Sequence, residues 1–249
     1  MKSKYLITIV GILAVPCLLL AQNGLTSKAK AEVSETNFNY GYVHAGGVVS
    51  HSYMFKSGGS DSLRILKVQP ACGCTKAPLK KDVIASGDSS DVELVFTLNS
   101  AIRGQVSKTA TVYTNDTTRS SVQLQFVANS YASPDSVTPL TLSAGEIKFD
   151  GTGNAKEAKL LLTNVSTAPV KLQLVCSSPS FFKADVPESA IAPGKSKEIK
   201  VKLADKLAVD EFRQSFTFQV DDQAGTRYTI PVELAKPGQA STIQPVSGH

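Results

Sequence analysis

The stretch IASGDSSDVELVF at residues 84–96 has a counterpart 107 positions later, IAPGKSKEIKVKL at residues 191–203. Both stretches begin with Ile-Ala-x-Gly, in which the glycine is typical of a turn. Both end with three apolar residues at alternate positions, a spacing typical of a strand with one buried face. The two stretches therefore predict the same turn and strand, made twice by one chain.

The duplication extends to both sides of these stretches. At the same offset of 107, Phe55-Lys56-Ser57 aligns with Leu162-Thr163-Asn164, and Leu63-Arg64-Ile65 aligns with Val170-Lys171-Leu172. At an offset of 108, the apolar positions 122, 124 and 126 align with 230, 232 and 234. Two copies of about 100 residues each are predicted, the usual size of an immunoglobulin-like unit.

The predicted fold class is all-β, with two tandem immunoglobulin-like β-sandwich domains that follow a cleaved signal peptide. After the leader, no stretch keeps an apolar stripe of period 3.6 over three turns, so helices are not expected beyond single turns. We place the domains at residues 35–130 and 140–235. The connecting segments are an N-terminal linker at 22–34, a Ser- and Pro-containing linker at 131–139 and a disordered tail at 236–249.

Residues 1–21 have the pattern of a secretory signal peptide. Lys2 and Lys4 precede an apolar run from Tyr5 to Leu20, and Ala21 supplies a small residue before the predicted cleavage site at Gln22. This run has about 16 residues, fewer than the ~20 that a helix needs to span a bilayer. The mature protein is therefore expected to be exported, either to the periplasm or to the cell surface or medium, with no membrane insertion after cleavage.

Charge and cysteine content exclude two classes of protein. Cleavage removes two lysines from a net charge of +5, and the remaining +3 gives no case for binding nucleic acid. It also removes Cys17, which leaves Cys72, Cys74 and Cys176, an odd number that excludes a framework of disulfides. Cys176 shares a strand face with Leu172 and Leu174, so we expect it to be a core residue.

The motif Pro70-Ala71-Cys72-Gly73-Cys74-Thr75 is the strongest chemical signal in the chain. Residues two apart in an extended chain point the same way, so both sulfurs face one side. The pair could form a small, reducible disulfide, bind Cu(I) between two thiolates, or simply pack. Packing or a local disulfide is favoured over a metal site, because C-x-C alone lacks the third and fourth ligands that zinc requires. No cofactor is predicted, with Cu(I) as the alternative.

No catalytic set was found, so we expect a protein that is not an enzyme. His51 alternates with Val49 and Tyr53 on one strand face and is expected to be a hydrogen-bonded, half-buried histidine. His44 precedes a predicted turn. Asp221 and Asp222 also fall in a predicted turn, where solvated carboxylates are common. No nucleophile, base and acid occur at recognisable spacing, nor does a phosphate-binding glycine loop.

The first copy resembles a bacterial family of unknown function, family 1573. The resemblance is carried by Pro-x-Cys-Gly-Cys-Thr at 70–75, the Ile-Ala-Ser-Gly turn at 84–87 and Val-Tyr-Thr-Asn at 112–115, and it covers residues 35–130. It implies an immunoglobulin-like sandwich related to Hydin-type and major-sperm-protein-like modules, usually exported and without an established activity. The second copy lacks the cysteine motif and looks like a diverged relative.

The main functional hypothesis is a non-catalytic binding or scaffolding protein of the cell envelope, whose partner is a protein or another envelope component. The alternative is a thiol-redox or Cu(I)-handling protein that acts through Cys72 and Cys74. A glycan-binding role is weaker, because the chain has no tryptophan on which a sugar could stack. Clustering of Tyr40 and Tyr42 on an exposed face would support a glycan-binding role.

Overall fold

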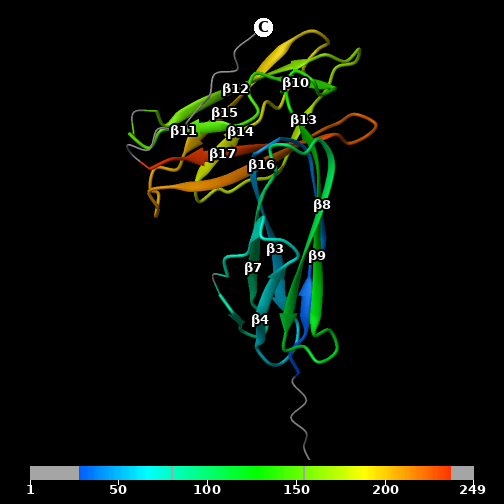
Figure 1. Cartoon of the computed structure of the whole chain (residues 1–249), viewed down its shortest axis with the longest axis vertical. Coiled ribbons are helices and arrows are strands. Elements are labelled where there is room, and N and C mark those ends of the chain that lie inside the picture. Colours follow the sequence, from blue (N-terminus) through cyan, green and yellow to red (C-terminus); the bar gives the residue numbers. More distant parts are fainter. Residues whose placement is uncertain (1–27, 80, 154, 237–249) are drawn as a thin grey trace, which may run out of the picture.

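A computed structural model describes residues 28–79, 81–153 and 155–236, which form strands, turns and loops without a helix. The prediction of an all-β protein is confirmed (Figure 1). Within these ranges there is no helix that could cross a membrane. The predicted signal peptide with its cleavage site at Ala21 and Gln22, and the tail beyond residue 236, lie outside the described residues.

The strands before residue 132 form the first unit, whose core is defined below. They are β1 (Ala31–Val33), β2 (Asn37–His44), β3 (Val48–Ser57), β4 (Leu63–Pro70), β5 (Thr75–Lys76), β6 (Val83–Ile84), β7 (Ser89–Thr97), β8 (Gly104–Thr114) and β9 (Ser121–Tyr131). The second unit follows. Its strands are β10 (Leu140–Leu142), β11 (Ile147–Phe149), β12 (Glu157–Asn164), β13 (Leu172–Cys176), β14 (Phe182–Asp185), β15 (Ser196–Leu203), β16 (Phe212–Val220) and β17 (Arg227–Leu234).

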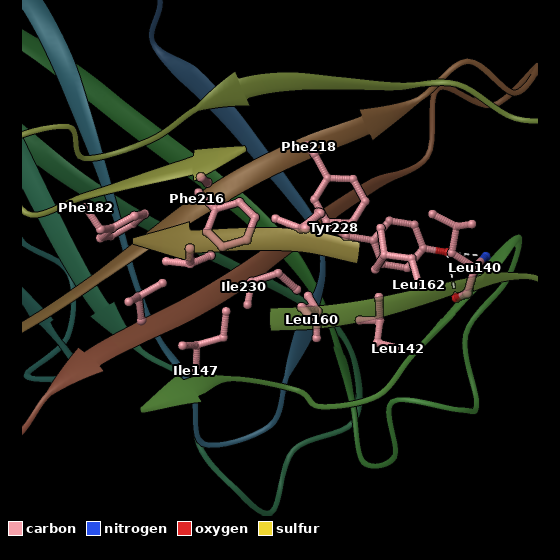
Figure 2. Close-up of a cluster of buried hydrophobic side chains, with 14 of the residues drawn as sticks. Leu140, Leu142, Ile147, Leu160, Leu162, Phe182, Phe216, Phe218, Tyr228 and Ile230 are labelled. Carbon is pink, nitrogen blue, oxygen red and sulfur yellow. Dashed lines mark hydrogen bonds between the residues drawn. The ribbon is translucent and has the colours of Figure 1, made fainter. Parts of the chain in front are cut away.

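Each unit buries its own apolar core between two layers of strands. In the first unit the sheet β1-β3-β7-β5 faces β2, β9, β8 and β4, and in the second the sheet β10-β12-β15-β14 faces β13, β16 and β17. The first core includes Tyr53, Phe96 and Phe126. The second is drawn in Figure 2 and includes Phe216 and Tyr228. Alternating side chains of facing layers fill each core, as expected for a sandwich.

Two strand pairings in the structure are separated by 107 residues. Leu63 pairs with Ile84 in the first unit, and Val170 pairs with Ile191 in the second, each 107 residues later. In the last hairpin of each unit, β8–β9 and β16–β17, the observed offset between the copies differs from the predicted offset of 108. The last pairs before their loops are Tyr113 with Ser121 and Gln219 with Arg227, so the offset there is 227 − 121 = 106.

The predicted linkers contain structured residues of the two units, so their boundaries are wrong. In the segment 22–34, β1 pairs with β3 and Ala31 is buried. In the segment 131–139, Tyr131 ends β9, and Val137 is buried in the second core. Buried backbone must find hydrogen-bond partners. Pro134 O, for example, accepts from the N–H of Leu142. The connection between the units is therefore packed onto them and is not a free spacer.

A single continuous sheet joins the two units, in the order β13-β16-β17-β2-β9-β8-β4-β6. Strand β2 lies at the junction, because Tyr42 and Val43 pair in parallel with β9 on one side and with β17 on the other. Figure 1 shows the second unit lying across one end of the first. Gly41 lies at a bulge in β2, and a Cβ atom there would be 2.0 Å from Arg227 O.

A network of hydrogen-bonded, buried polar side chains also links the two units at this junction. Gln214 on β16 is the hub. Its Oε1 accepts hydrogen bonds from Ser50 Oγ at 2.6 Å and from Ser178 Oγ at 2.8 Å, and its Nε2 donates to Glu93 Oε1 at 2.9 Å. Ser50 N also donates to Ser215 Oγ. Because buried polar groups cost free energy unless they are paired, this network fixes the orientation of one unit on the other.

Candidate functional site

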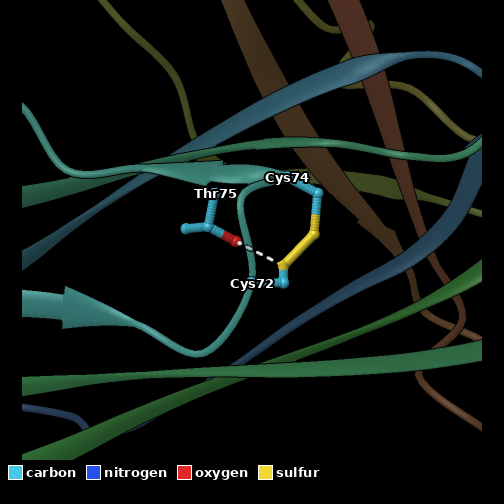
Figure 3. Close-up of a disulfide and its surroundings, with 3 residues drawn as sticks. All are labelled: Cys72, Cys74 and Thr75. Carbon is cyan, nitrogen blue, oxygen red and sulfur yellow. Dashed lines mark hydrogen bonds between the residues drawn. A yellow bond between two sulfur atoms is a disulfide. The ribbon is translucent and has the colours of Figure 1, made fainter.

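The cysteine motif lies where the chain of the first unit crosses from one sheet to the other. Strand β4 ends at Pro70 in the continuous sheet, and β5 begins at Thr75 in the opposite sheet, where it pairs with β7. Cys72 and Cys74 are joined by a disulfide in this crossing loop (Figure 3). Thr75 is buried, and its hydroxyl lies 3.6 Å from Cys72 Sγ. The two cysteines therefore form a disulfide in this structure, which is one of the three states that the sequence left open, beside Cu(I) binding and simple packing.

The backbone of the loop is held on both sides. Ala71 N donates to Thr109 O of β8, and Thr97 N of β7 donates to Cys74 O. Both half-cystines are partly exposed, and Cys74 packs against the first core. Its equivalent 107 residues later is Phe181, which packs against the second core. At this position the first unit therefore has a half-cystine, and the second unit has an aromatic side chain.

A groove of about 900 Å³ runs beside this loop, between the two units. The first unit contributes Gly73 and Cys74 from the loop and Lys76 from β5, and the second contributes side chains from β11, β16 and β17. Its apolar part is formed by Val48, Val95, Leu98, Phe212 and Leu234. We call this the interunit groove. The sequence alone did not predict it, because no local motif joins residues from so many separate strands.

Charged side chains surround the apolar part of the interunit groove. Four cations and two carboxylates line it, namely Lys76, Lys148, Arg213, Lys236, Glu211 and Glu233. Most are paired, as in the contacts of Arg213 with Glu233 at 3.2 Å and of Lys236 with Glu211 at 3.1 Å. Lys76 makes no ion pair with any residue of the described ranges. The lining of the groove thus combines a net positive charge with apolar side chains.

The two histidines within the described residues, His44 and His51, lie on β2 and β3 of the first unit. His51 is buried, stacks on Phe38 with ring centroids 3.6 Å apart, and has Nε2 2.6 Å from Glu35 Oε1. Burial lowers the pKa of His51, while the hydrogen bond and charge of Glu35 oppose this shift. The expected hydrogen bond of His51 is therefore found, and its side chain is buried where a half-buried one was expected. His44 ends β2 and lies edge-to-face on Tyr131.

The strand that carries Cys176 differs from the prediction. A bulge lies between Leu174 and Cys176, and Leu174 is 39% exposed, so the two do not share a core face. Cys176 is partly buried and packs against the core of the first unit, across the junction. Burial raises the pKa of its thiol. A buried thiol of this kind is a weak nucleophile at neutral pH.

The remaining candidate residues, two aspartates and two tyrosines, have structural roles. Asp222 Oδ1 accepts from Thr226 N at 2.7 Å and holds its own turn, whereas Asp221 Oδ1 accepts from Lys171 N at 2.6 Å and joins this turn to the residue before β13. Tyr40 is completely buried, and Tyr42 packs against Tyr228. These two tyrosines therefore do not form an exposed platform. Among the described residues, no group of three or more potential metal ligands converges.

Together, the paired sheets and their packed cores define an all-β protein with an immunoglobulin-like fold. Residues 31–130 match a family whose description is "Protein of unknown function (DUF1573)". This match confirms the resemblance found for residues 35–130, and the matched segment contains the cysteine loop. No curated protein matches the sequence.

Several solved structures resemble this chain at low identity. A protein of unknown function from Porphyromonas gingivalis W83 is 11% identical, with 82% of this chain and 98% of that chain covered and a TM-score of 0.34. PapD-like domain 7 of human CEP192 is 12% identical, with 53% and 99% covered and a TM-score of 0.36. The E. coli chaperone DraB is 12% identical, with 82% and 97% covered and a TM-score of 0.32. These likenesses concern the fold alone.

Proposed function

We propose that this chain is an exported, non-catalytic binding protein of the cell envelope, and that a protein partner occupies the interunit groove. The observation that carries the proposal is the groove itself, held between two units that a continuous sheet and the Gln214 network join. A groove whose walls are fixed in advance needs little ordering when a partner binds. The leader pattern at residues 1–21 supports export.

The lining favours a partner segment with an apolar side chain and at least one carboxylate. Phe212 and Leu234 supply an apolar surface, and Lys76 supplies a cation without an ion pair in the described ranges. Charge complementarity of this kind mainly sets specificity and the rate of association. An acidic segment of an envelope protein is therefore the expected occupant.

Site-specific photo-crosslinking tests this proposal. A benzophenone amino acid replaces Asn99 in the interunit groove, or Gln173 on exposed β13 as the matched control, in cells that export the chain. We expect a discrete crosslinked species from position 99 that is absent from position 173 and is lost when Lys76→Glu is added. The same crosslinks from both positions, or none from position 99, would contradict a partner in the groove.

A thiol-redox function is the second candidate, favoured by the disulfide at the edge of the same groove. A thiolate of a partner would attack Sγ of Cys72 or Cys74, form a mixed disulfide and release the other cysteine as a thiolate. Cu(I) could bind only after such a reduction, because a disulfide offers no thiolate ligand.

Intact mass after alkylation tests the redox candidate. The exported protein should gain no alkyl group on Cys72 and Cys74 before reduction and two after mild reduction, and it should recover the disulfide on reoxidation. Adding Cu(I) to the reduced protein shows whether the pair retains metal through desalting. A pair that neither cycles between the two states nor retains Cu(I) would remove this candidate and leave the groove proposal intact.

A further inference from the structure

A second hollow region lies apart from the cysteine loop, between β2 and β9 of the first unit and the β16–β17 hairpin of the second. It consists of two adjoining hollows of about 440 and 300 Å³ that share Asn39, Val127, Ala224, Gly225 and Arg227. We call it the amide cleft, because six amide side chains line it: Asn37, Asn39, Gln105, Gln125, Asn129 and Gln219. None of its lining residues is a carboxylate.

Half of these amides are already oriented by the protein. Asn39 Oδ1 accepts from Gly41 N at 2.8 Å, Gln125 Nε2 donates to Ser107 Oγ at 2.9 Å, and Gln219 Oε1 accepts from Arg227 Nε at 2.8 Å. Each uses one end of the amide and leaves the other end available. The cleft therefore presents fixed donors at Asn39 Nδ2 and Gln219 Nε2 and a fixed acceptor at Gln125 Oε1.

The remaining three amides, Asn37, Gln105 and Asn129, have side chains without a hydrogen bond to any residue in the described ranges. Gln105 and Asn129 are directly opposite each other on β8 and β9. An amide offers two donors and an acceptor with two lone pairs, so a pair of them can address neighbouring groups that both donate and accept.

The single charge in the cleft is used by the protein. Arg227 Nη1 donates to Asn39 O at 3.2 Å, its Nε donates to Gln219, and its guanidinium lies 5.7 Å from the centre of the Phe38 ring. An anionic ligand would thus meet one cation that is already engaged. The lining favours an uncharged ligand.

The amide side chains are the main groups through which the cleft can recognise a ligand. At Tyr42 and Val43, β2 is paired on both edges, so a peptide cannot add a strand there, while from Asn37 to Asn39 it is paired with β9 alone. A ligand rich in hydroxyl groups is uncharged and suits these amides, because each hydroxyl donates one hydrogen bond and accepts others, as an amide does. Val127, Ala128 and Tyr42 supply an apolar surface beside the amides.

From this geometry we infer that the amide cleft binds a neutral glycan, an oligosaccharide or polysaccharide of uncharged sugars, through hydrogen bonds to its amides and not through stacking on Tyr40 and Tyr42. The same outward face continues along β8 through Ser107, Thr109, Thr111 and Tyr113. From Gln105 to Tyr113 it extends about 27 Å at ~3.4 Å per residue, long enough for a chain of several sugars. This site is separate from the interunit groove and does not depend on the function proposed there.

Affinity electrophoresis of the mature chain tests the inference. Native gels contain mixed-linkage β-glucan, mannan or dextran as neutral probes and polygalacturonate as the anionic probe. We expect at least one neutral polysaccharide to retard the protein in a saturable way and polygalacturonate to have no effect. The double variant Gln105→Ala/Asn129→Ala should weaken this binding at least fivefold, the effect expected when a net hydrogen bond is lost.

The matched control is Lys200→Ala, which removes an exposed strand side chain of the second unit that makes no hydrogen bond or ion pair within the described ranges. It should bind like the wild type, and thermal unfolding should show that all variants are folded. The inference is overturned if no neutral polysaccharide retards the wild type, if the double variant binds as well as the wild type, or if only polygalacturonate is bound. Crosslinking in the interunit groove should be the same in the double variant, so the two proposals can fail separately.

Discussion

At the scale of single residues, buried tyrosines differ in what their hydroxyl groups contact. Tyr53 Oη donates to Gln125 O at 2.9 Å, whereas Tyr40 Oη is buried without a hydrogen-bond partner in the described ranges. Tyr53→Phe should therefore lower the free energy of unfolding by about 1 kcal/mol, and Tyr40→Phe should leave it unchanged or raise it. Urea unfolding of both variants measures the difference. A larger loss for Tyr40→Phe than for Tyr53→Phe would contradict the assignment.

Asp116 links stability to pH. Burial opposes its charge, but hydrogen bonds from the N–H groups of Ala31, Thr118 and Arg119 and from the Thr118 hydroxyl lower its pKa to about 2 from an ordinary value of 3.8. Because the folded pKa is the lower one, the unfolded chain binds this proton first as the pH falls. The contribution of Asp116 is therefore present above about pH 4 and is lost between about pH 4 and pH 2.

The variant Asp116→Asn tests this linkage. It should be less stable than the wild type at pH 7, and the difference in free energy of unfolding should shrink as the pH falls from about 4 to about 2. Urea titrations at pH 7, 4 and 2.5 measure it. Asp205→Asn, at a position whose side chain is 89% exposed, is the control and should follow the wild type throughout. A difference that does not change with pH would show that the charge of Asp116 is not involved.

At the scale of elements, the bulge in β2 is the critical feature. Gly41 has a φ of +65°, and an added Cβ would collide with the backbone of Arg227 across the junction. Gly104 has a φ of +82° with open space around it, so it separates backbone strain from the collision. We predict that Gly41→Ala destabilises the protein by about 2 kcal/mol or more beyond Gly104→Ala. Thermal and urea unfolding compare the two, and equal losses would argue against close approach of β2 and β17.

The hairpins show which aspects of an element can be predicted from its sequence. Alternating apolar residues correctly placed one face of β9 and of β17 in the core. The predicted offset of 108 was nevertheless wrong by two residues. A shift of a strand by two residues leaves the same side chains on the same face, so the alternation of apolar residues does not distinguish the two offsets. The register is decided by the turns. Asn115 Oδ1 accepts from Arg64 N, and Asp221 Oδ1 accepts from Lys171 N at the equivalent place.

At the scale of the whole molecule, the two units are expected to unfold together. Separation of one unit from the other would break the hydrogen bonds of the Gln214 network and the pairing of β2 with β17, at a cost of about 0.5–1.5 kcal/mol for each bond. We predict a single cooperative transition in calorimetry, with equal calorimetric and van't Hoff enthalpies. Two separated transitions would contradict a coupled pair of units.

Removing the hub of the network should weaken this coupling. Gln214→Leu leaves Ser50 Oγ and Ser178 Oγ without their acceptor, and a loss of about 1–3 kcal/mol in the free energy of unfolding is expected. It should also increase cleavage near residues 132–139 in limited proteolysis, since these residues connect the units. Gln173→Ala on exposed β13 is the control and should unfold like the wild type. Stability equal to that of the control would show that the network adds nothing to the junction.

The sequence by itself determined the class of secondary structure, the two apolar cores and the resemblance carried by Cys72-Gly73-Cys74-Thr75, because these depend on side-chain periodicity and on local motifs. Only the tertiary structure decided how the units are joined, and with that the interunit groove and the amide cleft. Their lining residues come from strands far apart in the chain, such as Cys74 with Phe212 and Asn39 with Arg227. Such neighbours arise from strand pairing across the junction, and a periodic pattern contains no information about which strand lies beside which.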